Sequence, residues 1–324
     1  MSKFLITGAT GFIGSYLTER CVSLGHHVVA FDRYNPNNHW GWLETSEYNN
    51  DMEVILGDVR DYDSVSKAMK GCGAVFHLAA LIGIPYSYVS PLAYIRTNVE
   101  GTYNVLEAAK NLELEQVLIT STSETYGTAQ YTPIDEKHPL VGQSPYAASK
   151  IAADQLALSY YKSFDLPVKI VRPFNTYGPR QSARAVIPTI MHQCNAGNAQ
   201  IKLGNFEPTR DLTFVKDTCE GFLEIYKSEA FFGEVTNIGM NSEISIKDLA
   251  HEIMKIMEVD LPIVSDEERI RPEKSEVEHL VCNNEKLLSN SSWRPEYTLK
   301  SGLSETIDWF RENGRLRKSE LYHI

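Results

Sequence analysis

Two residues in the middle of the chain are suited to exchanging a proton with a hydroxyl group. Tyr146 and Lys150 open a stretch, residues 151–164, whose Ala, Leu and Gln content and periodicity are typical of a helix. They stand one helical turn apart and so share a face, and Pro145 suits the first turn. A cation beside a phenol favours phenolate, so we expect Lys150 to lower the pKa of Tyr146 and make it a base. Taken alone, the pattern also fits a packed tyrosine beside a solvated lysine.

A second reactive set, Thr122, Ser123 and Glu124, follows an apolar run at residues 117–120. The run predicts a buried strand that ends at Thr120. Ligands of open α/β sheets bind beyond the carboxyl ends of the strands, so we expect this set to meet the tyrosine helix in one site. Glu124 fits a catalytic base, and it also fits a solvated acid at the end of a strand.

A glycine-rich turn at the N-terminus must position a cofactor for such a site. The apolar run 3–7 predicts a buried strand, and Gly8-x-x-Gly11-x-x-Gly14 leads into a helical pattern at residues 15–24. Gly8 would make the tight turn, Gly11 would let the backbone approach a pyrophosphate, and Gly14 would allow close helix packing. Phosphates would sit at the helix N-terminus. We assign Phe12 and Ile13, between the last two glycines, to the same contact.

An acidic residue ends the second predicted strand, residues 28–31. Asp32 stands where a carboxylate can bind the adenosine ribose hydroxyls of a dinucleotide. A carboxylate there repels a 2′-phosphate, which favours NAD over NADP, although Arg33 next to it could pair with such a phosphate. Strand, glycine turn, helix, strand and acid together predict dinucleotide binding.

Further strands and loops extend this half of the chain. Residues 34–50 are polar and aromatic, and fit either a loop over the adenine or a surface loop anchored by tryptophans. Asp58 and Val59, after a predicted strand at 53–56, would contact adenine, although Asp58 could equally cap the next helix. The helix is expected at residues 62–69.

The fourth predicted strand, residues 74–80, ends in a turn of small residues. Leu78, Ala79 and Ala80 would let a cofactor pass close to the backbone. His77 in the same strand is interpreted as a buried structural residue. A helix is expected at residues 92–110, with Asn98 among its polar positions.

Bulk properties exclude several classes of protein. The chain has 324 residues and a net charge of −11, which argues against general binding to nucleic acid or to an acidic membrane. Its five cysteines form no C-x-x-C pair and no metal-ligand pattern, so reduced core thiols of a cytoplasmic protein and no bound metal are expected. No apolar run is long enough to span a bilayer.

The chain resembles, over essentially its whole length, the extended short-chain dehydrogenase/reductases, in the branch of nucleotide-sugar epimerases and dehydratases. The marks are Gly8-x-x-Gly11-x-x-Gly14, Asp32, Asp58-Val59, Leu78-Ala79-Ala80, Asn98, Thr122, Tyr146-x-x-x-Lys150 and Arg172-Pro173-Phe174-Asn175-Thr176-Tyr177-Gly178-Pro179. The resemblance implies an α/β fold, a Rossmann-type doubly wound parallel sheet with a smaller α/β substrate-binding lobe. The NAD-binding domain would hold residues 1–175 and about 215–240, and the lobe residues 176–214 and about 241–324.

Three residues indicate the branch. Thr122-Ser123-Glu124 resembles the 4,6-dehydratases, with Ser where the sugar-thymidylate dehydratases have Asp; GDP-mannose dehydratases share Thr-Ser-Glu. Epimerases usually have small residues at positions 123 and 124. The chain as a whole is most similar to the dehydratases that act on NDP-N-acetylglucosamine at the start of legionaminic acid synthesis. The closer match lies in Trp40-Gly41-Trp42-Leu43, Ile84-Pro85-Tyr86-Ser87-Tyr88 and Pro179-Arg180-Gln181-Ser182-Ala183-Arg184-Ala185-Val186-Ile187-Pro188.

The resemblance implies a reaction in which the sugar C4 is oxidised first, because the ketone makes the C5 hydrogen acidic. Tyr146 would take the O4 proton, Thr122 would hydrogen-bond O4, and Lys150 would hold the nicotinamide ribose. Glu124 would then take the C5 proton, water would leave across C5–C6, and the hydride would return to C6, so the cofactor stays bound. A serine is too weak to be a strong acid, so Ser123 would only relay a proton, or protonated Glu124 would supply it.

The resemblance also implies a nucleotide-sugar site, for GDP- or UDP-N-acetylglucosamine. Asn175 would contact the diphosphate, and Arg210 and Arg271 match diphosphate- and ribose-binding arginines, whose guanidinium groups suit phosphate oxygens. Further substrate contacts are assigned to Ile84, Tyr86, Arg184, Val186 and Lys202.

Three rival functions remain open at this stage. They are an NDP-sugar C4-epimerase, a 5,6-dehydratase that releases the alkene, and a cofactor-binding regulatory protein without turnover. Helices at 92–110 and 147–164 commonly pair across a two-fold axis in this family, which implies a homodimer.

Overall fold

A seven-stranded parallel sheet forms the centre of the larger part of the molecule. The computed structural model describes residues 2–313. The sheet has the order β11-β6-β5-β4-β1-β2-β3. Its strands are β1 (Lys3–Thr7), β2 (His27–Arg33), β3 (Glu53–Gly57), β4 (Ala74–His77), β5 (Gln116–Thr120), β6 (Val168–Pro173) and β11 (Val235–Ile238). The order reverses between β1 and β4, which is where ligands bind in doubly wound sheets.

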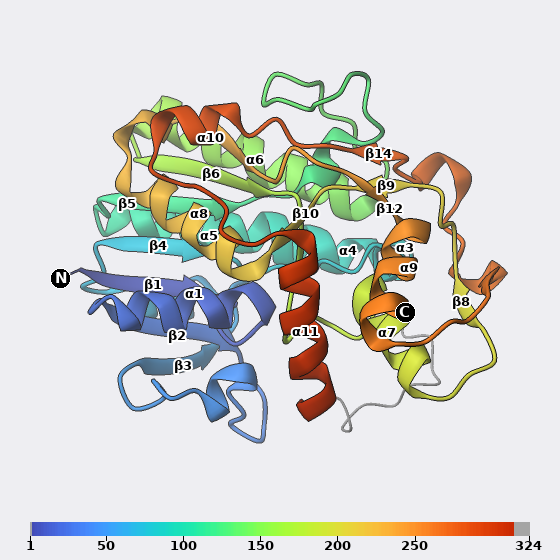
Figure 1. Cartoon of the computed structure of the whole chain (residues 1–324). Helices are drawn as coiled ribbons and strands as arrows, with labels where there is room; N and C mark the ends of the chain where they lie inside the picture. The colour runs from blue at the N-terminus through green and yellow to red at the C-terminus, as the bar shows by residue number, and fades with distance from the viewer. Residues whose placement is uncertain (1, 314–324) are drawn as a thin grey trace.

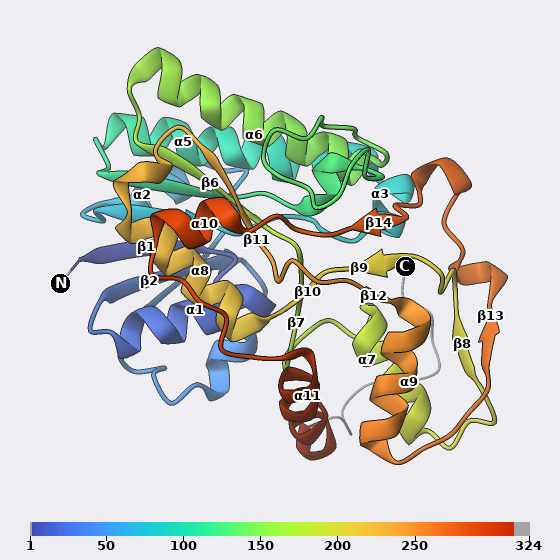
Figure 2. The same cartoon turned by 45° about the horizontal axis from the view of Figure 1, so that its top comes forward.

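Helices cover both faces of this sheet, so its strands are buried and read as apolar runs. Figure 2 shows α5 and α6 on one face and α1 and α8 on the other. The covering helices are α1 (Phe12–Ser23), α2 (Tyr62–Met69), α5 (Gly101–Asn111), α6 (Pro145–Phe164) and α8 (Val215–Lys227). The predicted Rossmann-type α/β fold is confirmed.

The helix expected at residues 92–110 is not regular. It consists of α4 (Pro91–Tyr94), a π-helical turn (Ile95–Glu100) and α5. Such π turns often mark functional sites, and this one contains the buried Asn98.

A smaller lobe, with α7, α9 and β8, lies to the right of the sheet in Figure 1. Its helices are α7 (Val186–Asn195), α9 (Ile246–Met257) and α11 (Leu299–Asn313). Its strands are β7 (Asn175–Tyr177), β8 (Ile201–Leu203), β9 (Thr209–Arg210), β10 (Leu212–Phe214), β12 (Ile244–Ser245), β13 (Ile263–Ser265) and β14 (His279–Leu280). They form small sheets in the orders β10-β7, β12-β9-β14 and β13-β8.

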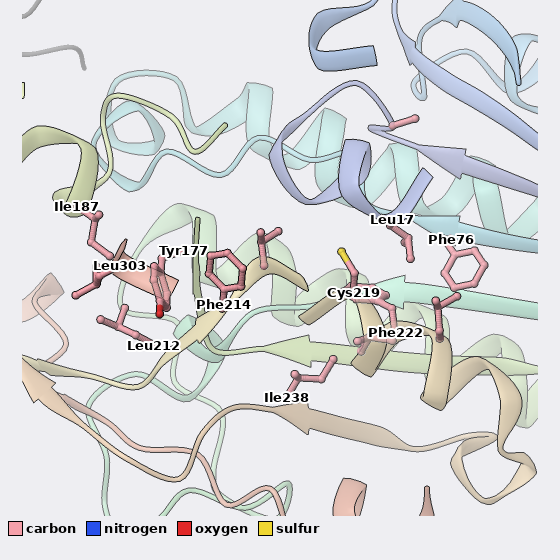
Figure 3. Close-up of a cluster of buried hydrophobic side chains, with 14 of the residues drawn as sticks. Leu17, Phe76, Tyr177, Ile187, Leu212, Phe214, Cys219, Phe222, Ile238 and Leu303 are labelled. Atoms are coloured by element: carbon pink, nitrogen blue, oxygen red, sulfur yellow. The ribbon is translucent and has the colours of Figure 1, made fainter. Parts of the chain in front are cut away.

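The two parts share one hydrophobic core. Figure 3 shows buried side chains that run from Leu17 of α1 and Phe76 of β4 to Ile187 and Leu303 in the smaller lobe. The remaining short elements are α3 (Ile84–Val89), α10 (Glu285–Asn290) and the 3-10 turns Gly41–Thr45, Ser123–Tyr126, Glu229–Phe231, Glu267–Arg269 and Glu273–Ser275. Because α10 packs against β11, the chain returns to the large sheet late in its course. The lobe boundaries stay a prediction. The position of α10 adds one more passage of the chain between the smaller lobe and the large sheet.

Disulfides, metal sites and membrane-spanning helices can be assessed in the described residues, 2–313. All five cysteines are free and buried. Within residues 2–313, no group of His, Cys, Asp and Glu is arranged to hold a metal ion. No helix in this range has the length and apolarity needed to cross a bilayer. The basic stretch at residues 315–318 lies outside the described residues.

Candidate active site

The first two turns of α6 carry the tyrosine and lysine of the predicted pair. Ser144 caps the helix, its hydroxyl accepting a hydrogen bond from the Ala147 N–H at 3.1 Å. Tyr146 is 7% exposed and Lys150 4%. The ammonium of Lys150 donates to the backbone carbonyl of Thr120 at the end of β5, at 2.6 Å. The alternative interpretation of this pattern, a packed tyrosine beside a solvated lysine, is therefore wrong.

The expectation that Lys150 lowers the pKa of Tyr146 is wrong for the chain as described. Burial raises the pKa of the Tyr146 phenol, and the charge of Glu124 raises it further; a hydrogen bond with Thr122 opposes them. Burial also lowers the pKa of Lys150, against the charge of Asp154, which raises it. Desolvation of the fully buried phenol therefore decides the direction of its pKa shift.

The three residues after β5 approach the same tyrosine. Thr122 caps the short turn Ser123–Tyr126, and its hydroxyl accepts a hydrogen bond from the Glu124 N–H at 3.3 Å. Glu124 is half-buried, and its charge acts on Tyr146 and also on Arg210. Ser123 is 2% exposed. The structure thus brings a hydroxyl, a carboxylate and a phenol together beyond the end of β5.

The glycine turn has the shape that a bound pyrophosphate requires. Gly8 has φ +71°, and a Cβ there would lie 2.8 Å from the Ala79 nitrogen. A Cβ on Gly14 would lie 2.0 Å from the Gly8 carbonyl oxygen. Helix α1 begins at Phe12, directly after Gly11, so Phe12 and Ile13 form its first turn. A side chain at Gly8 or Gly14 would therefore collide with the backbone of residues 78–79 or of the turn itself, so glycine keeps this turn tight in front of the N-terminus of α1, where a pyrophosphate can bind.

Asp32 is held in place by the glycine turn itself. One of its carboxylate oxygens accepts hydrogen bonds from the Thr10 N–H at 2.8 Å and the Thr10 hydroxyl at 2.6 Å. The other accepts from the Arg33 N–H at 2.6 Å, whereas the Arg33 side chain is exposed. Sequence reasoning missed Thr10, although a hydroxyl between the first two glycines was the available signal.

The loop at residues 34–50 anchors to this turn from behind. The Trp42 N–H donates to the Thr10 carbonyl at 3.2 Å, and its ring packs edge-on against Trp309 of α11 at 5.5 Å between centroids. The loop was expected either to cover the adenine or to be a surface loop anchored by tryptophans. The described contacts fit the second interpretation.

The predicted adenine end has its own local arrangement. Asp58 accepts hydrogen bonds from Arg60, and the Asp58 pKa is lowered chiefly by that contact. The helix α2 is capped by Asp61, not by Asp58. Val59 is buried against Gly101, the first residue of α5.

Asn98 joins the small-residue turn after β4 to the catalytic helix. Its side-chain oxygen accepts from the Leu81 N–H at 2.8 Å, and its amide donates to the Leu81 carbonyl and to Ser149, each at 2.9 Å. Asn98 therefore holds the backbone of Leu81, directly after the Leu78-Ala79-Ala80 turn, against Ser149 of α6. His77 is buried between Thr7 and Thr102, and burial lowers its pKa to about 3, so its structural interpretation is confirmed.

Aromatic side chains line the approach to Tyr146. The ring of Tyr94 lies edge-on to Tyr146 at 6.2 Å, and Tyr86 lies 6.2 Å beyond Tyr94. Ile84 is buried in the same cluster, and Arg184 approaches it at Gly83. Tyr94 was not predicted; in the sequence it is one of several aromatic residues on an expected helix.

Two predicted arginines converge on one carboxylate. Arg210 lies 3.3 Å and Arg271 3.6 Å from the same Glu276 oxygen. Arg210 is 8% exposed, and burial lowers its pKa. The side-chain nitrogen of Asn175 is buried without a hydrogen-bond partner, so it has a donor to offer a ligand. Glu276 was missed because nothing in the sequence marks a carboxylate as a partner of distant arginines.

Two other predicted substrate residues lie on the elements of the smaller lobe. Val186 is the first residue of α7. Lys202 is exposed in the middle of β8, and its backbone is bonded to Gln193. The structure does not bring the Lys202 side chain together with the two arginines in any described contact.

A doubly wound sheet, a glycine turn backed by an acid, and a tyrosine and lysine one turn apart define the class. The protein is an enzyme of the extended short-chain dehydrogenase/reductase type. Residues 5–306 match the family model described as GDP-mannose 4,6 dehydratase. The chain belongs to this family of NDP-sugar dehydratases and epimerases.

Individual relatives cover nearly the whole chain. A dTDP-glucose 4,6-dehydratase of Xanthomonas campestris pv. campestris is 30% identical, over 97% of this chain and 94% of its own. The crystal structure of DesIV, the dTDP-glucose 4,6-dehydratase of Streptomyces venezuelae with NAD and TYD bound, has a TM-score of 0.87 and 26% identity, with 96% and 97% covered. The UDP-N-acetylglucosamine 4-epimerase of Methanobrevibacter ruminantium M1, in complex with UDP-N-acetylmuramic acid, has a TM-score of 0.86 and 27% identity, with 96% and 98% covered.

Proposed function

We propose that this enzyme is an NAD-dependent NDP-hexose 4,6-dehydratase that converts GDP- or UDP-N-acetylglucosamine to the 4-keto-6-deoxy sugar nucleotide. The observation on which the proposal rests is the placement of Glu124. Glu124 lies in the turn that follows β5 and is capped by Thr122, and its charge raises the pKa both of Tyr146, expected to bind the sugar, and of Arg210, expected to bind its phosphates. A carboxylate in this position has a task in a dehydratase and none in an epimerase.

NAD fits the residues of the larger lobe. The tight glycine turn, which admits no side chain at Gly8 or Gly14, leads directly into the N-terminus of α1, and Asp32 presents a carboxylate held by Thr10 at the end of β2. The crystal structure of DesIV contains NAD in the same fold. When bound, NAD would accept a hydride from C4 of the sugar and return it to C6.

The residues beyond β5 would move the protons. Tyr146 takes the O4 proton while Thr122, which is bonded to it, holds O4 in place. Glu124 takes the C5 proton, which is acidic once C4 is a ketone, and hydroxide leaves from C6. The hydroxide leaves as water, with a proton from Glu124 either directly or through Ser123, and C5 would take a proton from solvent when C6 takes the hydride. Lys150 holds the ribose next to the nicotinamide and keeps a positive charge beside the developing phenolate.

The diphosphate would bind in the smaller lobe. Arg210 and Arg271 supply the local positive charge that a protein of net charge −11 otherwise lacks. Their shared partner Glu276 keeps both guanidinium groups paired, and the buried amide of Asn175 supplies a further donor. We assign Ile84, Tyr86, Tyr94 and Arg184 to the sugar side, and Val186 to the phosphate side.

The N-acetylglucosamine substrate and a place at the start of legionaminic acid synthesis extend this proposal. Its support is the likeness of the loops at residues 40–43, 84–88 and 179–188 to that branch. The test is incubation of the purified protein with GDP- and UDP-N-acetylglucosamine in heavy water, followed by mass spectrometry. We expect the product to have lost one water and to have gained one deuterium at C5. A product that keeps its original C5 hydrogen would contradict the mechanism.

The solved epimerase that matches this fold favours a second candidate, an NDP-sugar C4-epimerase. Substitution of Glu124→Gln separates the two. A dehydratase loses water elimination but still oxidises C4, whereas an epimerase retains full activity and its product keeps the C6 hydroxyl. Product with a 5,6 double bond would indicate a 5,6-dehydratase, and no turnover of any sugar nucleotide would revive the regulatory reading.

We propose further that the enzyme is a homodimer through the face that begins at α4. Leu92 and Ile95 are 56% and 53% exposed there, and Tyr103 on α5 is 44% exposed. Phe164 at the end of α6 is 52% exposed. Exposed apolar side chains at this density indicate an interaction surface. Light scattering of the wild type should give twice the chain mass, and Ile95→Glu should give the monomer.

A further inference from the structure

A salt bridge between α6 and β6 lies next to the proposed catalytic residues and belongs to none of them. An Arg172 guanidinium nitrogen is 2.7 Å from an Asp154 oxygen, and the two side chains are 1% and 0% exposed. Complete burial of two charges is unfavourable unless they are well paired and further hydrogen-bonded. A pair of this kind does not stabilise a fold better than apolar residues of equal volume, so its retention calls for another reason.

The pair is connected to both ends of the segment that contains Thr122 and Glu124. Ser121, just before this segment, donates its hydroxyl to the Asp154 carboxylate at 2.5 Å and accepts from Arg172 at 3.1 Å. The Arg172 guanidinium lies 4.6 Å from the centre of the Tyr126 ring. Tyr126 ends the turn and is itself fixed by a hydrogen bond to Asn237 at 2.8 Å.

The same pair faces the catalytic lysine. Asp154 stands one helical turn after Lys150 on α6, and its second carboxylate oxygen is buried without a hydrogen-bond partner. The pKa of Lys150 is lowered chiefly by burial. The charge of Asp154 raises it, and that of Arg172 lowers it. His77 of β4 also lies within reach of the lysine charge. Lys150 is bonded to Thr120, the residue before Ser121, so helix and segment meet at adjacent residues.

We propose that Asp154 and Arg172 are positioning residues: through Ser121 and Tyr126 they hold Thr122 and Glu124 in register with Tyr146 and Lys150. The inference rests on the proposed function, because it concerns the same proton-transferring groups. Misplacement of such groups by about 1 Å costs on the order of 100-fold in rate. The pair touches none of the residues assigned to the diphosphate, so it should act on turnover and not on substrate affinity.

The main test replaces the pair by apolar residues of similar size. The double variant Asp154→Leu/Arg172→Met leaves no unpaired charge, and such replacements keep a fold stable. With the nucleotide sugar that the wild type turns over, we expect kcat to fall about 100-fold and KM to change less than about threefold. A pair that serves only stability would leave kcat unchanged in the folded double variant.

A milder variant covers the case in which the double variant does not fold. Ser121→Ala leaves the salt bridge intact and removes only its link to the catalytic segment. We expect kcat to fall about tenfold with KM unchanged. The matched control is Asp217→Asn, another buried carboxylate, which accepts the N–H groups of Glu296 and Tyr297 far along the chain. It should lower the melting temperature and leave kcat alone.

A readout without turnover separates this inference from the proposed function. Amide hydrogen exchange of residues 122–126, in the full chain loaded with NAD, should be faster in Ser121→Ala and in the double variant. It should be unchanged in Asp217→Asn. If the wild type turns over no nucleotide sugar, the proposed function fails and the exchange result still decides. Wild-type exchange and wild-type kcat in both site variants would overturn the inference.

Discussion

The two ends of the site differ in how far their charged groups are exposed to solvent. At the catalytic end, Tyr146 and Lys150 are almost fully buried, and burial is the largest influence on the pKa of each. At the diphosphate end, Arg210 is also buried, but the Arg271 side chain is 28% exposed, and both arginines share the carboxylate of Glu276. Buried groups respond strongly to the loss of a single neighbour, whereas half-exposed charges are screened by solvent.

This difference has a chemical purpose. Proton transfer needs groups held in fixed positions away from bulk water, and burial of Tyr146 and Lys150 supplies this. Phosphate binding needs positive charge that can change partners as the ligand enters and leaves. The predictions below test this contrast, and run from the largest expected effect to the smallest.

The sharpest test lies at the buried end. Tyr146→Phe keeps the ring and its contact with Tyr94 but removes the only proton acceptor proposed for O4. We expect kcat to fall at least about 1,000-fold, with the melting temperature unchanged or raised. Mass spectrometry of the sugar nucleotide measures the turnover. A fall of less than about tenfold would mean that another group takes the O4 proton.

At the other end, Arg210→Met removes one guanidinium and leaves Arg271 with Glu276. Losing charge-assisted hydrogen bonds to a diphosphate should raise KM roughly 10- to 100-fold with a smaller change in kcat. Initial rates against substrate concentration measure both constants. Lys247→Met, on the exposed face of α9, is the matched control. If kcat falls more than KM rises, Arg210 acts on Glu124 and not on the phosphates.

The buried end also predicts a pH dependence of stability. Folding lowers the pKa of His77 from 6.5 to about 3, so this residue stabilises the fold above pH 6.5 and loses that contribution as pH falls toward 3. Between pH 7 and pH 5 the wild type should lose about 2 kcal/mol more free energy of unfolding than His77→Gln does. Urea titrations at both pH values give the difference. Equal losses in the two proteins would show that His77 is not held neutral by the fold.

The smallest effect expected is that of salt. Raising ionic strength from about 0.05 M to 0.5 M should raise KM about threefold, because the arginine cluster is partly exposed. The value of kcat should not change, because salt does not screen the buried Tyr146 and Lys150. A larger effect of salt on kcat than on KM would reverse the comparison between the two ends.

Local patterns predicted much of the site. The strand, glycine turn, helix and acid at residues 3–32 were predicted correctly because each depends on neighbours in sequence. Helix α2 was expected at the residues where it occurs. The convergence of Arg210 and Arg271 followed from the resemblance, but their common partner Glu276 did not. The π turn at Asn98 was missed because its cause is the contact of this side chain with Leu81 and Ser149, which no periodicity records.

The order of elements, the cradle for a dinucleotide and the pairing of Tyr146 with Lys150 were therefore determined by the sequence alone. Backbone sterics at glycine and the helical repeat act over a few residues, so their outcome can be read without a fold. The tertiary structure alone decided the ionisation of that pair and the salt bridge between Asp154 and Arg172. Desolvation depends on everything packed around a group, and those neighbours arrive from strands and helices far apart in the chain.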